Sequence, residues 1–277
     1  MIRILLYSMS FIFISLCFSV SAFAAKKSMD DVDCVIEPYR TVELSSPVQG
    51  VLDEVLVKRG DTVKKGQVLA RLKSGVEQAG VNLAKARAES MTDIKVNREK
   101  YELNKRSLKR VKELFQKKLV PPNDYDEAVT TVVIGELEVL LATENHHVAQ
   151  LELNRSEEIL KLRSIISPID GVVVERYKSP GEFVEDQPLL KLAQVNPLNV
   201  EVVVPLYWLR TIKKGMSVQV YPEKPIGGAY KAKVVIVDPV VDSASGTLGI
   251  RLELPNNNHS IPAGLTCNVK FPGKRRK

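Results

Sequence analysis

Apolar and polar residues alternate with period two in two stretches far apart in the chain, residues 46–63 and 167–184. Such alternation is typical of short strands that bury one face. The stretches are copies of each other at an offset of 121 residues. Glycines interrupt both copies at equivalent places: Gly50 and Gly60, and Gly171 and Gly181. We expect tight turns with positive φ at these glycines.

A unit of this size cannot bury both faces alone, so two units must interlock. We therefore expect one flattened sandwich built from residues 41–74 and 164–194. The pattern resembles the two halves of a biotinyl/lipoyl-type domain. In those carriers a modified lysine lies where the halves meet, and Lys73 is nearest that point. No Met-Lys-Met or Asp-Lys-Ala turn surrounds Lys73, so we interpret it as a solvated lysine at a strand end.

Residues 75–163, between the two half-motifs, read as a helical hairpin. Pro121 and Pro122 end the first helix, because a proline pair cannot continue one. Asp124 and Glu127 have capping-box spacing and are expected to start the second. The sequence predicts two helices of roughly 40 residues, each about 60 Å long.

Both predicted helices carry an apolar stripe with heptad spacing, which is typical of a two-stranded antiparallel coiled coil. The stripe of the first helix contains Ile94, Tyr101, Leu108 and Phe115, and that of the second contains Ile134, Leu137, Leu141, Val148 and Leu151. Charge also favours pairing: residues 84–118 hold twelve Lys or Arg against five acids, and residues 124–162 hold nine acids against two bases. Exposed pairs of this kind contribute about 0–1 kcal/mol each.

Residues 195–272 predict a small antiparallel β-barrel of short strands separated by Pro, Gly and Asn turns, with a short helix at Leu206–Lys214. Residues 25–40 could add a strand to it. That strand would bring Cys34 near Cys267, and the two cysteines would then be either a disulfide or two buried thiols.

The first residues resemble a secretion signal, with Arg3, an apolar run at residues 4–20, and Ala22-Phe23-Ala24 as a cleavage site. Residues 1–24 are then a signal peptide removed before Ala25, or alternatively an uncleaved anchor. Both alternatives export the chain. Residues 273–277 form a basic tail.

No pattern in the chain favours catalysis, a cofactor or a metal. The sequence lacks a G-x-S-x-G elbow, a phosphate loop and C-x-x-C spacing. Asp238 and Asp242 fall in turn-like contexts, where Asp commonly bonds its own backbone. The adjacent His146 and His147 are read as solvated. The net charge of +7 is not gathered into one aromatic-laced patch, which argues against a nucleic-acid partner.

The order half-motif, helical hairpin, half-motif and barrel resembles the periplasmic adaptor, or membrane fusion protein, family of tripartite efflux and type I secretion systems. The local motifs agree: residues 165–172 (IISPIDGV) resemble the family's second-half entry, and residues 238–247 (DPVVDSASGT) and 262–264 (PAG) resemble its barrel signature. The resemblance implies a multidomain α+β fold: a barrel-sandwich hybrid with an inserted coiled-coil hairpin, plus a small β-barrel.

The resemblance also implies a mechanical function in place of an enzymatic one. Such adaptors link an inner-membrane transporter to an outer-membrane channel and self-associate, often as hexamers, in the periplasm beside the inner membrane. Their hairpin tip docks on the channel through Arg, Leu four residues on, and Ser seven beyond. Arg110 and Leu114 fit that spacing here, but Pro121 replaces the Ser. Arg110 and Leu114 could also be a solvated charge and ordinary packing between the helices. A non-channel scaffold and a lipoyl/biotinyl-like carrier are the alternative functions.

Overall fold

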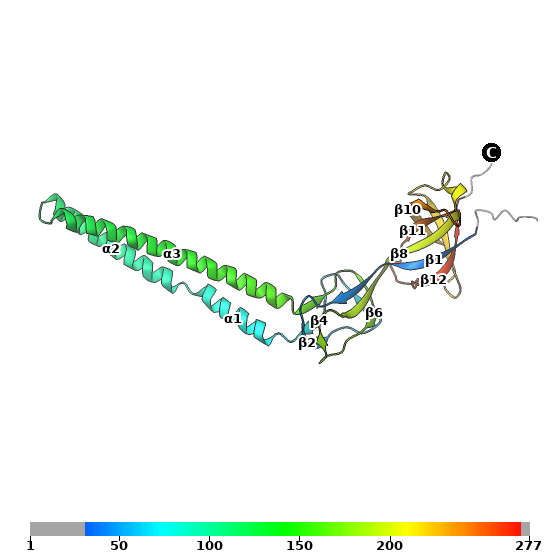
Figure 1. Ribbon diagram of the computed structural model, residues 1–277, viewed down its shortest axis with the longest axis horizontal. Helices are drawn as coiled ribbons and strands as arrows, with labels where there is room; N and C mark the ends of the chain where they lie inside the picture. The colour runs from blue at the N-terminus through cyan, green and yellow to red at the C-terminus, as the bar shows by residue number, and fades with distance from the viewer. Residues whose placement is uncertain (1–30, 273–277) are drawn as a thin grey trace, which may run out of the picture.

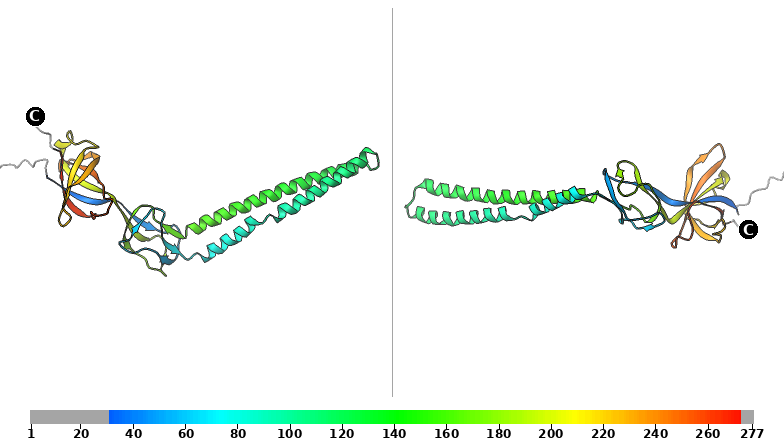
Figure 2. Two further views of the ribbon diagram at one scale, coloured as in Figure 1. Left: turned by 180° about the vertical axis from the view of Figure 1, so that it is seen from behind. Right: turned by 90° about the horizontal axis from the view of Figure 1, so that it is seen from below.

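The computed structural model describes residues 31–272, so the predicted signal peptide and basic tail lie outside the described residues. The molecule is elongated: a helical hairpin projects from a small sandwich, and a second β-domain lies at the opposite end (Figures 1 and 2). Within residues 31–272, no helix combines the length and the apolar character that a membrane span requires.

Two long strands run through both β-domains. Strand β1 (Val32–Ser45) and strand β8 (Pro188–Pro205) pair antiparallel from Cys34 opposite Val202 to Ser45 opposite Pro188. The narrow connection between the domains in Figure 1 consists of this ribbon. The predicted domain boundaries after residues 40 and 194 therefore fall inside continuous strands.

The sandwich interlocks the two sequence copies. Its other strands are β2 (Gly50–Val55), β3 (Thr62–Val63), β4 (Val68–Leu72), β5 (Ser164–Ile166), β6 (Gly171–Arg176) and β7 (Phe183–Val184). One sheet has the order β1-β8-β6-β3 and the other has the order β5-β4-β2-β7. Short strand β3 of the first copy thus pairs with the second copy, and β7 of the second copy pairs with the first. The predicted interlocking is confirmed.

The pairing obeys the 121-residue offset of the repeat. Gly50 lies opposite Val184, and the equivalent residues Gly171 and Val63 also lie opposite each other. The turns match as well, because the amides of residues 58 and 179 each donate to the carboxylate three residues on, at 2.7 Å in both copies. The two halves are therefore related by an internal pseudo-twofold axis.

The glycine prediction is right for half of the positions. The second glycine of each copy has a φ of +93° or +91°, as the tight turn requires. Gly50 and Gly171 instead begin strands and do not have a positive φ, so the prediction of positive φ is wrong for these two glycines. A Cβ at Gly50 would lie 2.6 Å from Nη1 of Arg163, and one at Gly171 would clash with the carbonyl oxygen of Ala193. These two glycines are needed for close approach.

The hairpin consists of three helices: α1 (Gly75–Glu89), α2 (Thr92–Gln116) and α3 (Pro122–Lys161). The prediction of one unbroken first helix is wrong, because the chain leaves the helix at Ser90 and Met91. The buried positions of α1 lead to Ala88, and continuing their spacing would put Met91 and Lys95 on the contact face. The break moves that face to Ile94, which is half-buried.

Helix α3, which corresponds to the second predicted helix, has 40 residues as predicted, but it begins two residues before the predicted cap at Asp124. Its N-cap is Pro121, without a side-chain capping bond, and Pro122 is its first residue. Proline suits that position because its missing N–H has no helical acceptor there. The capping-box prediction for Asp124 and Glu127 is therefore wrong.

Only one of the two predicted apolar stripes faces the other helix. The stripe of α2 is half-buried against α3, whereas the predicted stripe of α3 is between 52% and 57% exposed. The face that α3 turns toward α1 and α2 has its own heptad of mainly small residues: Tyr125, Ala128, Val132, Gly135, Val139, Ala142, His146, Ala149, Leu153 and Ser156. We call this set the α3 seam. A Cβ at Gly135 would lie 3.4 Å from the Cα of Tyr101, so small side chains permit the close approach of the helices.

The second β-domain is a closed ring of six strands. Strands β9 (Ser217–Pro222), β10 (Tyr230–Asp242), β11 (Thr247–Leu254) and β12 (Leu265–Lys270) join β1 and β8 in the order β1-β12-β9-β10-β11-β8, and β8 pairs back with β1. The predicted helix at Leu206–Lys214 is wrong: only a 3₁₀ turn, η1 (Leu206–Trp208), forms there. The ring of Trp208 is anchored edge-on against Phe271 at 5.7 Å.

Cys34 and Cys267 face each other on β1 and β12, and their sulfur atoms are bonded, with the Cα atoms 4.9 Å apart. The cross-link ties the first strand of the ring to the last across 233 residues of chain.

We predict that Cys34→Ser lowers the free energy of unfolding of the ring by about 2–4 kcal/mol, because the unfolded chain loses a long-range constraint. Chemical denaturation of the exported protein measures this, with Thr266→Ser as the matched control. The intact protein should gain two hydrogen masses on reduction, and an unchanged mass would contradict the bond.

We also predict that Ala142→Gln lowers the thermal stability of the hairpin, because a long polar side chain must then enter the α3 seam. Leu141→Gln, on the opposite face, should leave the melting of a dilute sample unchanged. Circular dichroism at 222 nm measures both variants. The reverse ranking would mean that the stripe predicted from sequence is the true contact face.

Candidate functional site at the two ends of the hairpin

The tip of the hairpin is a tight turn after α2 that closes with two hydrogen bonds. The Leu119 amide donates to the Leu114 carbonyl at 3.0 Å, and the Lys118 amide donates to the Phe115 carbonyl at 2.9 Å. This is the Schellman arrangement of a helix C-terminus. Lys118 occupies the left-handed position, with a φ of +58°, where glycine is usual. A side chain there costs about 1–2 kcal/mol.

The turn presents apolar side chains to solvent. Leu119 is 67% exposed, and Leu114 is also exposed. Arg110 is exposed one helical turn before Leu114, and Pro121 is exposed at the start of α3. The fold thus brings the three predicted tip residues to one end of the hairpin. Leu119 was not among the predicted tip residues, although a leucine two residues before the pair Pro121-Pro122 has no helix in which to pack.

Beneath this turn, Phe115 and Tyr125 stack across the two arms with ring centroids 5.0 Å apart and planes within 9°. Phe115 is half-buried at the seam position. Leu114 points elsewhere and is exposed, so packing between the helices does not account for it.

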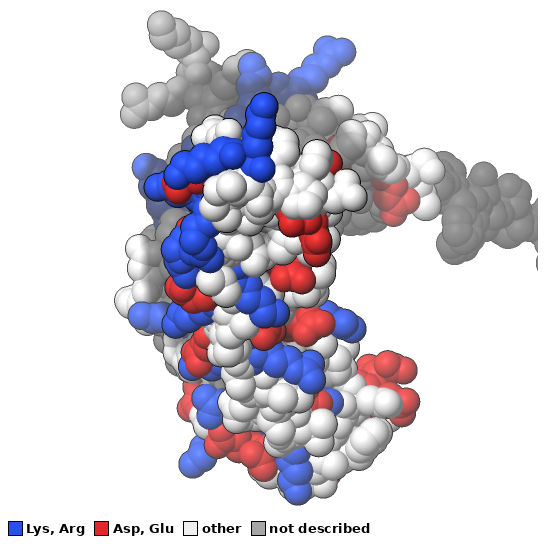
Figure 3. Space-filling view, turned by 90° about the vertical axis from the view of Figure 1, so that its left-hand side faces the viewer, with Lys and Arg blue, Asp and Glu red and all other residues white. Residues whose placement is uncertain are grey.

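The tip is strongly charged as well as apolar. Figure 3 faces this end of the molecule and shows basic side chains crowded around it. They come from the end of α2 and the turn, including Lys112, Lys117 and Lys118, while Asp124 and Asp126 lie at the start of α3. The tip is therefore an apolar knob beside a cluster of positive charge.

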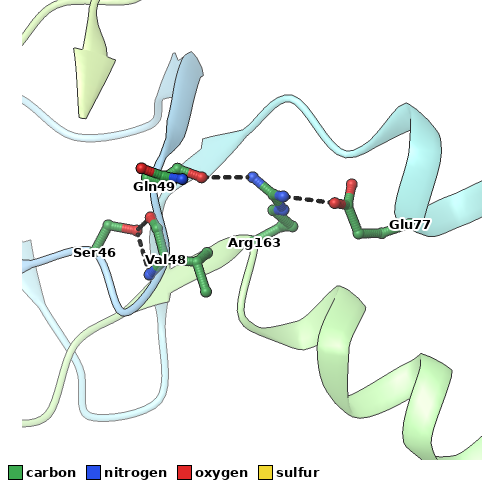
Figure 4. Close-up of polar contacts among 5 residues, drawn as sticks. All are labelled: Ser46, Val48, Gln49, Glu77 and Arg163. Atoms are coloured by element: carbon green, nitrogen blue, oxygen red, sulfur yellow. Dashed lines mark hydrogen bonds and ion pairs between the residues drawn. The ribbon is translucent and has the colours of Figure 1, made fainter. Parts of the chain in front are cut away.

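At the opposite end of the hairpin, one guanidinium connects three parts of the chain (Figure 4). Arg163 follows α3. Its Nη1 donates to the Gln49 carbonyl at 2.9 Å, and its Nη2 donates to Glu77 Oε1 at 2.5 Å. Gln49 lies in the turn before β2, and Glu77 lies in the first turn of α1. The side chains of Arg163 and Glu77 are only 22% and 15% exposed, so solvent screens this pair less than a surface pair.

The turn that holds Gln49 is the repeated motif itself. The Ser46 hydroxyl donates to the Val48 carbonyl at 2.5 Å, and in the second copy the Ser167 hydroxyl donates to the Ile169 carbonyl at 2.6 Å. In the first copy, the guanidinium of Arg163 binds the turn through the Gln49 carbonyl. At the equivalent place in the second copy, Gly171 packs against the backbone of Ala193. The pseudo-twofold symmetry is therefore broken where the hairpin is rooted.

Among residues 31–272, no three His, Cys, Asp or Glu side chains cluster in a way that could hold a metal ion. The Ser245 hydroxyl and the Ala244 amide donate to Asp242, and these bonds lower the pKa of its carboxyl group. That is the turn-capping role predicted for Asp242, which is the last residue of β10 before a turn, whereas Asp238 lies inside β10 and not in a turn. Lys73 is an exposed residue just after β4.

His147 is exposed, as predicted, whereas the prediction that His146 is solvated is wrong. It belongs to the α3 seam, and its Nδ1 is buried without a hydrogen-bond partner. Its Nε2 lies 3.0 Å from the Gln150 side-chain amide.

Comparison with known families matches most of the described chain. Residues 40–194 match the model of the CzcB-like barrel-sandwich hybrid domain, and residues 198–275 match the CusB-like β-barrel domain. The chain belongs to the periplasmic adaptor, or membrane fusion protein, family.

Named relatives agree with this assignment. The chain is 25% identical to the membrane fusion protein MtrC of Neisseria gonorrhoeae over 84% of its own length and 57% of that protein. It is 24% identical to the macrolide export protein MacA of Yersinia pestis over 85% of its length and 66% of that protein. The chain thus spans between about half and two thirds of these curated relatives.

Solved structures share the fold. The crystal structure of MacA from Actinobacillus actinomycetemcomitans superposes with a TM-score of 0.73 at 24% identity, covering 87% of this chain and 78% of that one. The membrane fusion protein Spr0693 of Streptococcus pneumoniae R6 gives 0.61 at 16% identity, covering 88% and 99%.

We predict that Arg163→Met frees the hairpin to change its direction relative to the sandwich, because both hydrogen bonds of the guanidinium are lost. Hydrogen bonds to charged groups contribute about 1.5–3 kcal/mol each. Distances between spin labels on α3 and the sandwich, measured by pulsed electron paramagnetic resonance, should broaden. Lys161→Met removes only the exposed pair with Glu158 and is the control. An unchanged distribution in Arg163→Met would show that the other root contacts suffice.

Proposed function

We propose that this protein is the periplasmic adaptor of a tripartite efflux or secretion system and links an inner-membrane transporter to an outer-membrane channel. The leader sequence exports the chain, which then works in the periplasm beside the inner membrane. The hairpin is a two-stranded antiparallel coiled coil that acts as a spacer, and the closed ring is the family's small β-barrel.

The observation that carries this proposal is the exposed tip. Leu114 and Leu119 expose apolar area at the far end of a long hairpin, where it serves no core of the described chain. Exposed apolar residues ringed by polar ones mark interaction sites. Arg110 contributes a charge beside them, and Pro121 begins the facing helix where the family motif has Ser. The channel would therefore be held by apolar and charged contacts in place of that hydroxyl.

The opposite end of the molecule is the proposed transporter side. The ring exposes Leu206, Tyr207 and Leu209 around η1, next to the exposed bases Arg210 and Lys213. This end also contains both ends of the described chain, since Lys270 pairs with Asp31 at 3.8 Å. The tip and this surface lie at opposite ends of the long axis (Figure 2), as a connector between two membranes requires.

The relatives' names support an efflux role for this chain, because they describe a macrolide export protein and efflux-pump periplasmic linkers. Self-association into a ring, often of six copies, belongs to the same proposal. The alternative is a scaffold without a channel partner, which the tip would also permit if it bound only other copies.

We predict that a photo-crosslinking amino acid at Leu119 captures an outer-membrane protein in living cells. The same probe at Val76, which is exposed at the root of the hairpin, should not. Mass spectrometry identifies the captured partner. Capture of only the protein's own copies from Leu119 would contradict the channel proposal and favour the scaffold.

A further inference from the structure

One end of the ring exposes apolar side chains that the ring does not use. Strand β8 leaves the sandwich and ends at Pro205, so the chain that follows lies at the end of the ring away from the sandwich. Residues 206–214 connect β8 to β9 there, and we call them the end segment. The Leu206 amide donates to the Gly246 carbonyl at 3.0 Å, which holds the end segment against the turn between β10 and β11.

The end segment divides its large side chains between the core and the solvent. Trp208 and Ile212, four residues apart, are buried in the core of the ring. Leu206, Tyr207 and Leu209 are exposed, and Tyr207 is 69% exposed. Since Trp208 and Ile212 close the core, the three exposed side chains are not needed to complete it. Exposed apolar side chains gathered in one place mark an interaction site.

The charge of the end segment has one sign. It contains no acid and three exposed bases: Arg210, Lys213 and Lys214. The acids that lie at the same end have other partners, because Asp31 pairs with Lys270 at 3.8 Å and Asp242 accepts the hydrogen bonds of its turn. The basic residues 274–277 follow β12, which also ends here. This end of the ring therefore has a local excess of positive charge.

The opposite end of the same ring has a different composition. The loop between β11 and β12 lies there, and the residues that it exposes include Asn257, Asn258, His259 and Ser260. None of these four is apolar or permanently charged. The combination of leucine, tyrosine and uncompensated bases is thus a property of one end, and the general composition of the ring does not explain it.

We propose that the end segment binds directly to the surface of an anionic phospholipid bilayer. Leu206, Tyr207 and Leu209 enter the boundary between headgroups and acyl chains, where leucine and aromatic side chains of surface-bound segments lie. The bases contact the lipid phosphates, and their apolar stems extend along the same boundary. The proposal rests on the adaptor function only for the choice of membrane, which is the inner one beside the transporter.

The composition of the end segment favours a lipid surface over a protein partner. Lysine is depleted at protein interfaces, and two of the three bases here are lysines. Segments that lie on membranes instead combine lysine and arginine with leucine and aromatic residues. The described chain also begins at this end, at Asp31 beside Lys270, so the predicted leader connects to the chain here.

The test uses Trp208, the only tryptophan of the sequence, as the reporter. Its ring centroid lies 6.2 Å from that of Tyr207, so a lipid chain that reaches Tyr207 also comes close to the indole. Bromine atoms on acyl chains quench tryptophan fluorescence at short range. The full exported chain is titrated with brominated vesicles of phosphatidylglycerol and phosphatidylethanolamine, and separately with brominated phosphatidylcholine vesicles. We expect half-maximal quenching at a lipid concentration at least tenfold lower for the anionic vesicles.

The charge variant neutralises the three bases of the end segment: Arg210→Gln, Lys213→Gln and Lys214→Gln. Each base near an anionic surface strengthens binding by about fivefold, so this variant should need at least tenfold more anionic lipid. The matched control neutralises one arginine and two lysines that are exposed on α2: Lys95→Gln, Lys100→Gln and Arg106→Gln. The control has the same net charge as the charge variant and should bind as the unchanged protein does.

The apolar variant, Tyr207→Ser with Leu209→Ser, should lower the quenching at saturating lipid, because the segment no longer enters the acyl-chain boundary. Circular dichroism checks that this variant is folded. A leader retained as an anchor would hold the chain on both kinds of vesicle. The same comparisons are then made on the depth of quenching at saturation, which still depends on lipid charge if the end segment binds.

Three results would each overturn the proposal: equal quenching by neutral and anionic vesicles, equal losses in the charge variant and its control, and no quenching at all. The last result would leave this surface to a protein partner. The adaptor function is tested separately. Capture of an outer-membrane protein from Leu119 without lipid contact would keep that function and reject the lipid contact, and lipid contact without capture would do the reverse.

Discussion

The antiparallel pairing of β1 with β8 is the constraint on which the rest of the structure depends. These two strands are the only elements of the described chain that belong to both β-domains, so their backbone hydrogen bonds set how the ring follows the sandwich. In the ring β1 alternates buried and exposed residues, and β8 contributes buried residues to both cores. Shifting the pairing by one residue would expose both apolar sets at once. The ring, the sandwich and the disulfide therefore depend on one register.

The direction of the hairpin relative to the sandwich is set at one point, the hydrogen bonds of Arg163. Arg163 joins α3, α1 and the turn of the first half-motif, and Gly50 leaves room for its guanidinium. The same turn in the second copy is closed by backbone packing against Gly171. The duplicated half-motif thus forms a pseudo-symmetric sandwich. Arg163 breaks that symmetry, because it bonds only to the turn of the first copy. Partly buried charge suits this role, since its hydrogen bonds restrict orientation more than apolar packing does.

Close approach of the helices determines what the hairpin leaves exposed. The α3 seam uses Gly135 and several alanines, so α3 lies tightly against its partner and the large apolar side chains are left outside. The hairpin therefore exposes apolar side chains at its tip, at Leu119, and along the face of α3 that contains Leu137 and Leu141.

The sequence by itself determined the duplicated half-motif, the inserted hairpin, the pattern of short strands in the third part and the family, because these depend on periodicity and on glycine and proline positions that act locally. It also put the correct stripe on α2. Only the tertiary structure decided which face of α3 is the seam. Hydrophobic spacing indicates an apolar face but does not say which partner covers it. The predicted α3 stripe was chosen because its side chains are larger than those of the α3 seam, and the structure leaves that stripe exposed. The role of Arg163 was likewise decided by contacts between distant segments, which periodicity along one segment does not contain.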